Sequence, residues 1–304
     1  MRDKQGRTVL RMRRHISLLA STLLALACGD VGAAGEPLRI GITGVLVEHN
    51  RALNEAMITY IGENVGRPVE ILHRKSYQEM SDLLERGLAD VAFVCGFPYV
   101  IDREKFGEAL LVSPVFNGKP LYQSYVIVPR DSDAKSLEDL RGKLYAFSDP
   151  LSNSGKLVPT YRLITIGETP ETFFRRYIFT YSHSANVEAV AVKLVDGASV
   201  DSYVWEYLKV VSPQLTSRTK VIERSPYHGM TPVVVRPGLD LSLKRKLRQA
   251  FLTMHRDRQG GAILKQLLID RFEEVPDALY DSIRTMRKVV ERRYQRLQAR
   301  PKAP

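Results

Sequence analysis

The sequence predicts an α/β fold with two lobes that close on each other like a clamshell. Between Leu38 and Val94, strand and helix patterns alternate, as in a parallel sheet covered by helices. A second α/β pattern extends to about residue 224. Two apolar strands, Tyr122–Pro129 and Pro232–Val235, are placed to leave the first lobe and to return to it. Lobes joined in this way close around a small ligand by hinge motion.

The first lobe is predicted from apolar periodicity and from residues that end helices. Strands and helices alternate over Leu38–Ile42, 50–65, Val69–Leu72, Tyr77–Arg86 and Ala89–Val94. Gly87 stands just past a helix end, where glycine is favoured. Gly96 and Phe97 form a turn after the third strand. Ligands bind such sheets at the carboxyl ends of strands, so we expect this turn to border a ligand site.

The later segments complete both lobes. The sequence predicts a short helix over Ser136–Arg141, a strand over Lys143–Phe147, and helices over Leu241–His255 and Ile263–Leu268. We therefore expect a signal peptide over 1–34, a first lobe of residues 35–125 and 229–283, a second lobe of residues 126–228, and a basic C-terminal helix or tail over 284–304. Each lobe should hold a mixed sheet flanked by helices.

The distribution of charge argues against nucleic acid as a partner. The chain has 304 residues and a net charge of +11. Residues 1–34 contribute +4 and residues 284–304 contribute +7, so the body between them is close to neutral. Binding to a phosphate backbone needs a basic surface on the folded body. The tail itself, with Met286 and Leu297 on one side, is typical of a charged helix packed on the body or touching anionic lipid.

The first 34 residues have the order of a secretion signal. A basic start is followed by an apolar run of about 12 residues, Ile16–Ala27, and by small residues ending at Ala34. That run is shorter than the roughly 20 residues of a membrane-spanning helix. We expect cleavage near Ala34 and a periplasmic protein, with Cys28, which follows Leu24–Ala27, as an alternative lipoprotein anchor. Cleavage or lipidation leaves Cys95 as the single free thiol, so no internal disulfide is possible.

The loop at 149–159 carries the strongest chemical signal. It follows a strand, precedes a helical pattern and holds Ser152, Asn153, Ser154 and Gly155. Unpaired N–H groups and the dipole at a helix start favour an anion, and these side chains add donors. Gly155 would leave room for close approach. A plain capping loop is the alternative interpretation. A phosphate-binding P-loop is excluded because Pro150 and Leu157 stand where its Gly and Ser/Thr belong.

Two later residues are candidates for the same site. His183 precedes a helical pattern and can donate a hydrogen bond to an anion, or it is an exposed loop residue. Asp201 can accept a hydrogen bond from a protonated ligand oxygen, and its negative charge would repel fully ionised competitors. A helix cap is the alternative interpretation of Asp201. The six histidines show no paired metal-ligand spacing. We therefore expect no metal and no cofactor.

These segments resemble the periplasmic phosphonate- and phosphite-binding proteins of ABC transporters. The resemblance covers nearly all of residues 36–285 and is carried by residues 89–96, 149–159, 183–190, 195–205, 225–226 and 232–236. It implies a type II periplasmic-binding-protein fold, a small oxyanion as ligand, a membrane permease as partner, and a monomer. The ligand-binding positions that it implies are Tyr77, Gly96, Phe97, Tyr122, Ser152, Asn153, Ser154, Gly155, His183, Asp201 and Tyr203.

One position departs from the family pattern. The gripping loop of the family typically reads Ser-Thr-Ser or Ser-Thr-Thr, whereas this chain has Asn153 in the middle. An amide replaces a compact hydroxyl there, so the pocket can be reshaped for another ligand. Lys156, just after the loop, could favour a more highly charged anion or could be solvated.

Two other functions are compatible with parts of the sequence. The same clamshell could present its ligand to a signalling partner instead of a permease. An exported hydrolase using His183 and a serine is less favoured, because no serine lies in the Gly-flanked turn of a nucleophile elbow. The sequence therefore predicts a non-enzymatic binding protein that captures phosphonate, phosphite or a phosphate-like anion.

Overall fold

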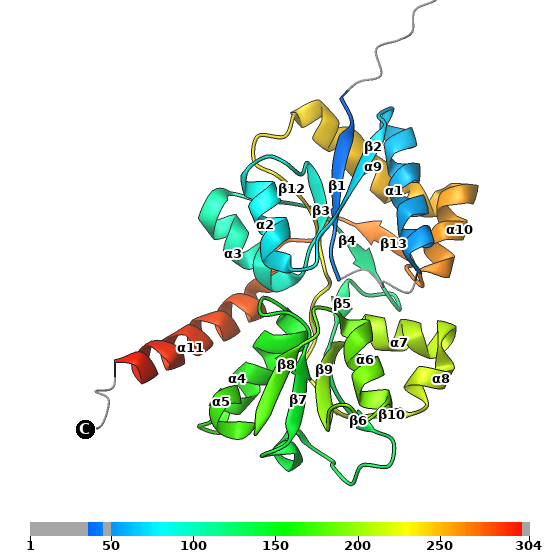
Figure 1. The fold of residues 1–304 in the computed structure, drawn as a ribbon. Helices are drawn as coiled ribbons and strands as arrows, with labels where there is room; N and C mark the ends of the chain where they lie inside the picture. The colour runs from blue at the N-terminus through cyan, green and yellow to red at the C-terminus, as the bar shows by residue number, and fades with distance from the viewer. Residues whose placement is uncertain (1–35, 45–49, 300–304) are drawn as a thin grey trace, which may run out of the picture. The chain divides into compact units, whose positions relative to one another are not determined.

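A computed structural model describes residues 36–44 and 50–299, and it contains two main sheets, each flanked by helices (Figure 1). The expected signal peptide over 1–34, with Cys28, lies outside the described residues, as do the last five residues of the tail. Within the described ranges, every helix is too short or too polar to span a membrane.

The first sheet has six strands in the order β13-β4-β12-β3-β1-β2. They are β1 (Leu38–Ile42), β2 (Val69–His73), β3 (Val91–Phe93), β4 (Ala109–Val115), β12 (Val233–Val235) and β13 (Arg271–Glu273). The first three are mutually parallel, whereas β12 pairs antiparallel with β3 and β4, so the sheet is mixed.

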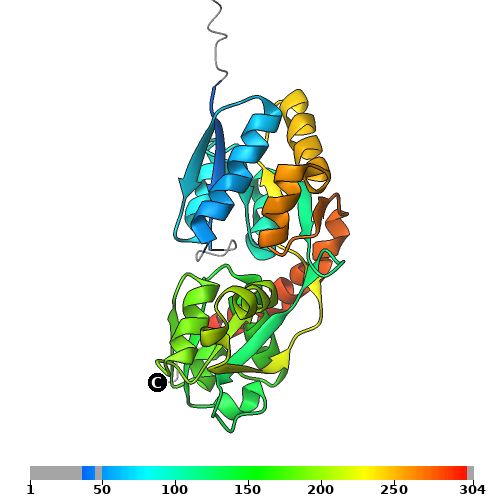
Figure 2. The same ribbon diagram turned by 90° about the vertical axis from the view of Figure 1, so that its right-hand side faces the viewer.

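Helices cover both faces of this sheet (Figures 1 and 2). One group consists of α1 (Arg51–Val65), α9 (Leu241–Thr253), the 3₁₀ turn η4 (Met254–Arg256) and α10 (Arg258–Gln266), and the other of α2 (Tyr77–Glu85) and α3 (Gly96–Phe106). Ser76 and Glu79 form a reciprocal capping box that starts α2. Gly66 ends α1 in the left-handed conformation, at φ 76°, where glycine has no steric penalty.

The second sheet has five strands in the order β10-β6-β9-β7-β8. They are β6 (Ser124–Pro129), β7 (Leu144–Phe147), β8 (Arg176–Phe179), β9 (Gly197–Asp201) and β10 (Thr219–Arg224). Its helical segments are η2 (Leu137–Leu140), the π-helical turn η3 (Asn153–Leu157), α4 (Val158–Thr165), α5 (Pro170–Phe173), α6 (His183–Ala191), α7 (Ser202–Val211) and α8 (Pro213–Thr216). Strands β7, β8 and β9 run parallel, and β6 and β10 run antiparallel to their neighbours.

A short antiparallel pair, β5 (Leu121–Tyr122) and β11 (His228–Gly229), connects the two sheets. The strand expected over Tyr122–Pro129 is interrupted at Gln123. The Gln123 N–H donates to Ser202 Oγ at 2.9 Å, and the Gln123 carbonyl oxygen accepts from the Ser202 N–H at 3.0 Å. Gln123 therefore leaves the strand ladder. The chain therefore passes from the connecting pair into the second sheet at this residue.

The C-terminal segment forms η5 (Asp277–Tyr280) and the long helix α11 (Asp281–Gln298). The helix begins three residues before the expected position at 284 because Asp281 already continues the turn of η5. Ile283 and Met286 are buried, and α11 packs against both α3 and α4 (Figure 1). The basic helix is thus attached to both lobes through its apolar side.

Candidate functional site

The loop after β7 is pinned at the junction of the two lobes. Ser152 caps η3, its Oγ accepting from the Gly155 N–H at 3.0 Å. The Asn153 N–H donates to Cys95 Sγ at 3.2 Å, and Asn153 Nδ2 donates to the Tyr122 hydroxyl at 2.9 Å. Cys95 precedes α3 in the first lobe and Tyr122 belongs to the connecting pair. The gripping loop therefore contacts all three parts of the clamshell.

Two polar atoms of this loop are buried without a hydrogen-bond partner. They are Asn153 Oδ1 and Ser154 Oγ, and both residues are fully buried. A buried polar group left unpaired costs about 1–3 kcal/mol, so native proteins rarely leave such atoms without a functional reason. Their position in the loop that the sequence singles out makes them candidates for ligand contact.

His183 is held as a neutral hydrogen-bond donor. Its Nδ1 accepts from the Asp201 N–H at 3.0 Å, so the ring proton sits on Nε2. Nε2 lies 3.4 Å from Ser152 Oγ and 3.5 Å from Ser148 Oγ, at the long limit for a hydrogen bond. Burial lowers the pKa of His183 to about 3, so the ring stays neutral. The side chain can offer an N–H without adding positive charge.

This tautomer also bears on hydrolase chemistry. A serine nucleophile needs an unprotonated nitrogen facing its hydroxyl, as a general base. Here the nitrogen that faces Ser152 carries the proton, and the other accepts a backbone N–H. The arrangement suits binding of an oxyanion rather than activation of a serine.

Asp201 is a buried carboxyl group at the start of α7. It caps that helix, with Oδ1 accepting from the Tyr203 N–H at 2.8 Å, so the capping role considered from the sequence is present. Burial raises the pKa of Asp201 to about 7. Near neutral pH this group exists in both forms, and its ionised form disfavours a second full negative charge nearby.

Tyr77 and Tyr122 share one buried region with Cys95 and Asp201. Burial raises the pKa of Tyr77 well above its ordinary value, and the nearby Cys95, Asp149, Asp201 and Tyr122 raise it further. Burial is also the main reason that the pKa of Tyr122 is raised, followed by Cys95 and Asp201. Both hydroxyls therefore stay protonated and can donate. Burial raises the pKa of the Cys95 thiol to about 11, so it too is neutral.

Lys156 lies against aromatic rings of β7 and β8, a contact that neither interpretation of its role from the sequence included. Its Nζ lies over the rings of Phe147, Tyr177 and Phe179, at 4.1, 4.7 and 5.7 Å from their centroids. Desolvation lowers its pKa to about 8. The ammonium is therefore held over these rings by cation–π contacts.

Four other predicted positions have packing roles in the structure. The Tyr203 hydroxyl donates to the Leu267 carbonyl oxygen at 2.7 Å, across the lobes. A Cβ on Gly96 would lie 2.7 Å from Ile283 Cδ1, so α11 requires glycine there. Phe97 packs in the cluster beneath α11. A Cβ on Gly155 would lie 1.8 Å from Ser148 Oγ, so this glycine allows the loop to approach Ser148. These contacts show how the four residues are held, and their contact with a ligand stays a prediction.

Sequence reasoning assigned no role to Asp149, Cys95 or Ser124, although all three hold the loop. Asp149 Oδ2 accepts from the Tyr77 N–H at 3.1 Å, and Oδ1 accepts from the Leu151 N–H at 2.7 Å. Ser124 Oγ donates to the Ser154 carbonyl oxygen at 2.6 Å. The position of Asp149 at the start of the loop was a usable signal. Cys95 precedes α3 and Ser124 begins β6, and nothing local marks the contact of either residue with the loop.

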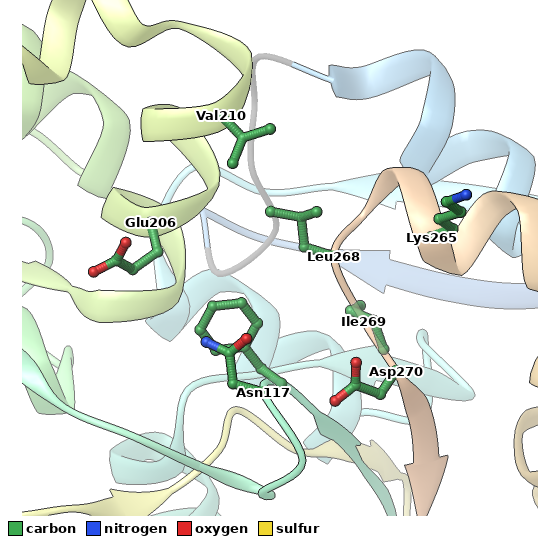
Figure 3. A pocket seen from close by; sticks show the side chains of 8 residues that line it. Asn117, Glu206, Val210, Lys265, Leu268, Ile269 and Asp270 are labelled. Carbon is green, nitrogen blue, oxygen red and sulfur yellow. The ribbon is translucent and has the colours of Figure 1, made fainter.

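A cavity of about 430 Å³ lies further along α7 (Figure 3). Glu206 and Val210 of α7 line one side, and the other side is lined by Lys265, near the end of α10, and by Leu268, Ile269 and Asp270, which follow it. The Phe116 ring also lines it and packs edge-on against Tyr203, with centroids 5.3 Å apart. The cavity thus borders the contact between the lobes rather than the buried polar cluster.

Comparisons with known proteins agree with this architecture. A family model described as "ABC transporter, phosphonate, periplasmic substrate-binding protein" matches residues 47–280. The chain is similar to the phosphonates-binding periplasmic protein of Escherichia coli, with 31% identity over 171 residues, 55% of this chain and 50% of that protein. It is 27% identical over 205 residues to the phosphate-import protein PhnD of Mycolicibacterium smegmatis, covering 60% of this chain and 64% of the relative. The matches therefore span about half to two thirds of the relatives' lengths.

The structural comparison extends further along the chain. A binding protein component of an ABC phosphonate transporter from Pseudomonas aeruginosa superposes with a TM-score of 0.79 at 26% identity, covering 84% of this chain and 87% of that one. The two-lobed type II periplasmic-binding-protein fold predicted from the sequence is confirmed, as is the family resemblance. The chain belongs to the family of periplasmic substrate-binding proteins of phosphonate ABC transporters.

Proposed function

We propose that the protein is the solute-binding component of an ABC transporter and captures a small phosphorus oxyanion between its lobes. The observation that carries this proposal is the pair of buried, unpaired atoms Asn153 Oδ1 and Ser154 Oγ, on a loop that contacts both lobes. The family supports a binding role, and the relatives named above are binding and import proteins rather than enzymes.

The donors available to the ligand are uncharged. The Ser154 hydroxyl, the Nε2–H of His183 and the hydroxyls of Tyr77 and Tyr122 are all buried. Hydrogen bonds from such groups to an anion are charge-assisted and strengthen where water is excluded. Lys156, the cation nearest to the gripping loop in sequence, contacts aromatic rings instead. Binding therefore depends on oriented dipoles rather than on an ion pair.

Acceptors in the same region select the protonation state of the ligand. Asn153 Oδ1 requires a donor, and the Asp201 carboxylate repels a second negative charge. A phosphonate or phosphite monoanion, which retains one P–OH proton, and dihydrogen phosphate, which retains two, each carry one negative charge and so satisfy both groups. Sulfate has no such proton near neutral pH and should be rejected. The relatives' names include both phosphonate and phosphate, which matches this shared chemistry.

Closure is stabilised by hydrogen bonds on α7 that do not touch the ligand. The Tyr203 hydroxyl reaches the Leu267 carbonyl oxygen, and Asn50 Nδ2 donates to the Tyr207 hydroxyl at 2.7 Å. These contacts join the second lobe to α10 and to the start of α1. The closed form would then dock on the permease and release the ligand as the lobes separate.

A thermal-shift screen tests the ligand assignment. Binding to the folded state raises the melting temperature by mass action. We expect shifts with methylphosphonate, aminoethylphosphonate, phosphite or phosphate, and none with sulfate. Ser154→Ala should abolish the shift, while Thr165→Ala, an exposed hydroxyl on α4, should not. A shift with sulfate as large as with phosphonates, or no shift with any phosphorus oxyanion, contradicts the proposal.

Export is proposed from the sequence and the family. Mass spectrometry of the protein recovered from the periplasm distinguishes the two routes. Cleavage near Ala34 gives an unmodified chain that begins close to Gly35. Lipidation gives a chain that begins at Cys28 with acyl mass. Recovery of the uncleaved chain from the cytoplasm alone would contradict export.

A further inference from the structure

The outward face of α11 concentrates positive charge. Lys288, Arg292 and Arg296 are exposed and follow one another at four-residue spacing. Four residues rise about 6 Å along a helix and turn it slightly more than once, so the three side chains form one stripe. We name these three residues the basic stripe.

The acidic residues of α11 are already paired with cations outside the basic stripe. Glu291 of the same helix accepts from Arg287 Nε at 2.7 Å, and Asp281 pairs with Arg284 at 2.7 Å. Among the described residues, no ion pair or hydrogen bond involves the side chain of Lys288, Arg292 or Arg296. The three cations are therefore available to an external partner.

The opposite side of α11 holds the stripe in a fixed position on the protein. Arg287 Nη1 donates to Glu104 Oε2 of α3 at 2.7 Å. Further along, Arg293 Nη2 donates to the Gly167 carbonyl oxygen at 2.7 Å and the Tyr294 hydroxyl donates to Glu171 Oε2 at 2.9 Å. Because α3 belongs to the first lobe and Gly167 and Glu171 to the second, the helix bridges the two. The stripe is therefore carried by a helix that packs against both lobes.

The chemistry of this face favours a lipid surface over a protein. Stable protein interfaces need an apolar centre, and the exposed face of α11 has no large exposed apolar side chain. A stripe of exposed cations without an apolar anchor suits a layer of phosphate headgroups. Each basic residue near an anionic membrane contributes about 1 kcal/mol.

We propose that the basic stripe of α11 docks the protein on an anionic phospholipid membrane. The docking is electrostatic and reversible, so it weakens as salt is added. It keeps the binding protein close to a membrane surface without a spanning segment. It is independent of the ligand, because the stripe lies outside the buried polar cluster.

Vesicle co-sedimentation tests the proposal with residues 35–304, which exclude Cys28 and the apolar run Ile16–Ala27 and so any acyl or signal-peptide attachment. We expect binding to phosphatidylglycerol-containing vesicles at low salt and not to pure phosphatidylcholine vesicles. Replacing the three stripe residues by Glu should lower the partition coefficient onto anionic vesicles about 5-fold for each lost cation, and roughly 100-fold or more in total. Ligand-induced thermal shifts should be unchanged.

The matched control is Arg245→Glu with Lys246→Glu and Arg258→Glu. These exposed cations on α9 and α10 give the same change in net charge on a different face. The control should retain most of the binding. Equal loss in both triple variants would mean that net charge alone attracts the protein and would overturn the proposal. Equal binding to neutral and anionic vesicles would also overturn the proposal. So would a lack of binding to anionic vesicles, which is the result expected if an acidic protein is the partner of the stripe.

Discussion

Replacing Tyr203 by Phe should weaken ligand binding through an effect on closure rather than through a lost contact with the ligand. The Tyr203 hydroxyl is buried and donates to the Leu267 carbonyl oxygen across the lobes at 2.7 Å. In an open form water can reach that carbonyl, so the loss falls on the closed form alone. A lost hydrogen bond is worth about 1 kcal/mol net, and an unpaired buried carbonyl adds up to about the same again. The expected rise in Kd is therefore about 5- to 30-fold.

Isothermal titration with methylphosphonate or inorganic phosphate, whichever shifts the melting temperature of the wild type, measures this change. Tyr145→Phe is the matched control, because the Tyr145 hydroxyl is equally buried but contacts Ser199 Oγ, at 2.5 Å, within the second lobe. The control should lower the melting temperature and leave Kd unchanged. An unchanged Kd in Tyr203→Phe, or an equal rise in the control, would refute the assignment of this contact to closure.

Three further predictions follow from the site. His183→Ala should weaken oxyanion binding about 10- to 100-fold by calorimetry, because a donor to a charged group is lost, whereas His183→Gln, which keeps an N–H, should retain part of the affinity; wild-type affinity in the alanine variant would exclude contact. The raised pKa of Asp201, about 7, makes stability fall as pH rises from about 4 to 7, while the lowered pKa of His183, about 3, makes stability rise with pH between about 3 and 6.5. These two effects of pH oppose each other, so Asp201→Asn removes the one that lowers stability as pH rises. Urea unfolding of this variant should show a free energy of unfolding that rises more steeply than in the wild type over pH 4 to 6.5, by up to about 1.4 kcal/mol per pH unit. Parallel dependence of the two free energies on pH would contradict the burial of this carboxyl. Gly155→Ala should destabilise by about 1–3 kcal/mol through its clash with Ser148 Oγ, and Ser148→Ala should recover part of the loss in the double variant; full additivity of the two losses would show that the clash is not the cause.

The sequence by itself determined the local architecture. Alternating apolar periodicity and the capping residues placed β1, β2, β3, β7, β12, α1, α2 and α9, since these signals act over a few residues. The strands β4, β8, β9, β10 and β13 were not predicted one by one. The loop at 152–155 was recognisable because short polar side chains before a helix have a local physical meaning. The family resemblance rested on the same local segments, in order.

Only the tertiary structure decided which of these residues face one another. Lys156 lies beside the gripping loop in sequence, yet its ammonium is held by rings from β7 and β8. Tyr203 follows Asp201 by two residues, yet its hydroxyl reaches the first lobe. Cys95 contacts Asn153 across 58 positions of the chain. Direction, burial and long-range pairing arise when elements pack, because a periodic pattern fixes which side of an element is apolar but not what that side meets.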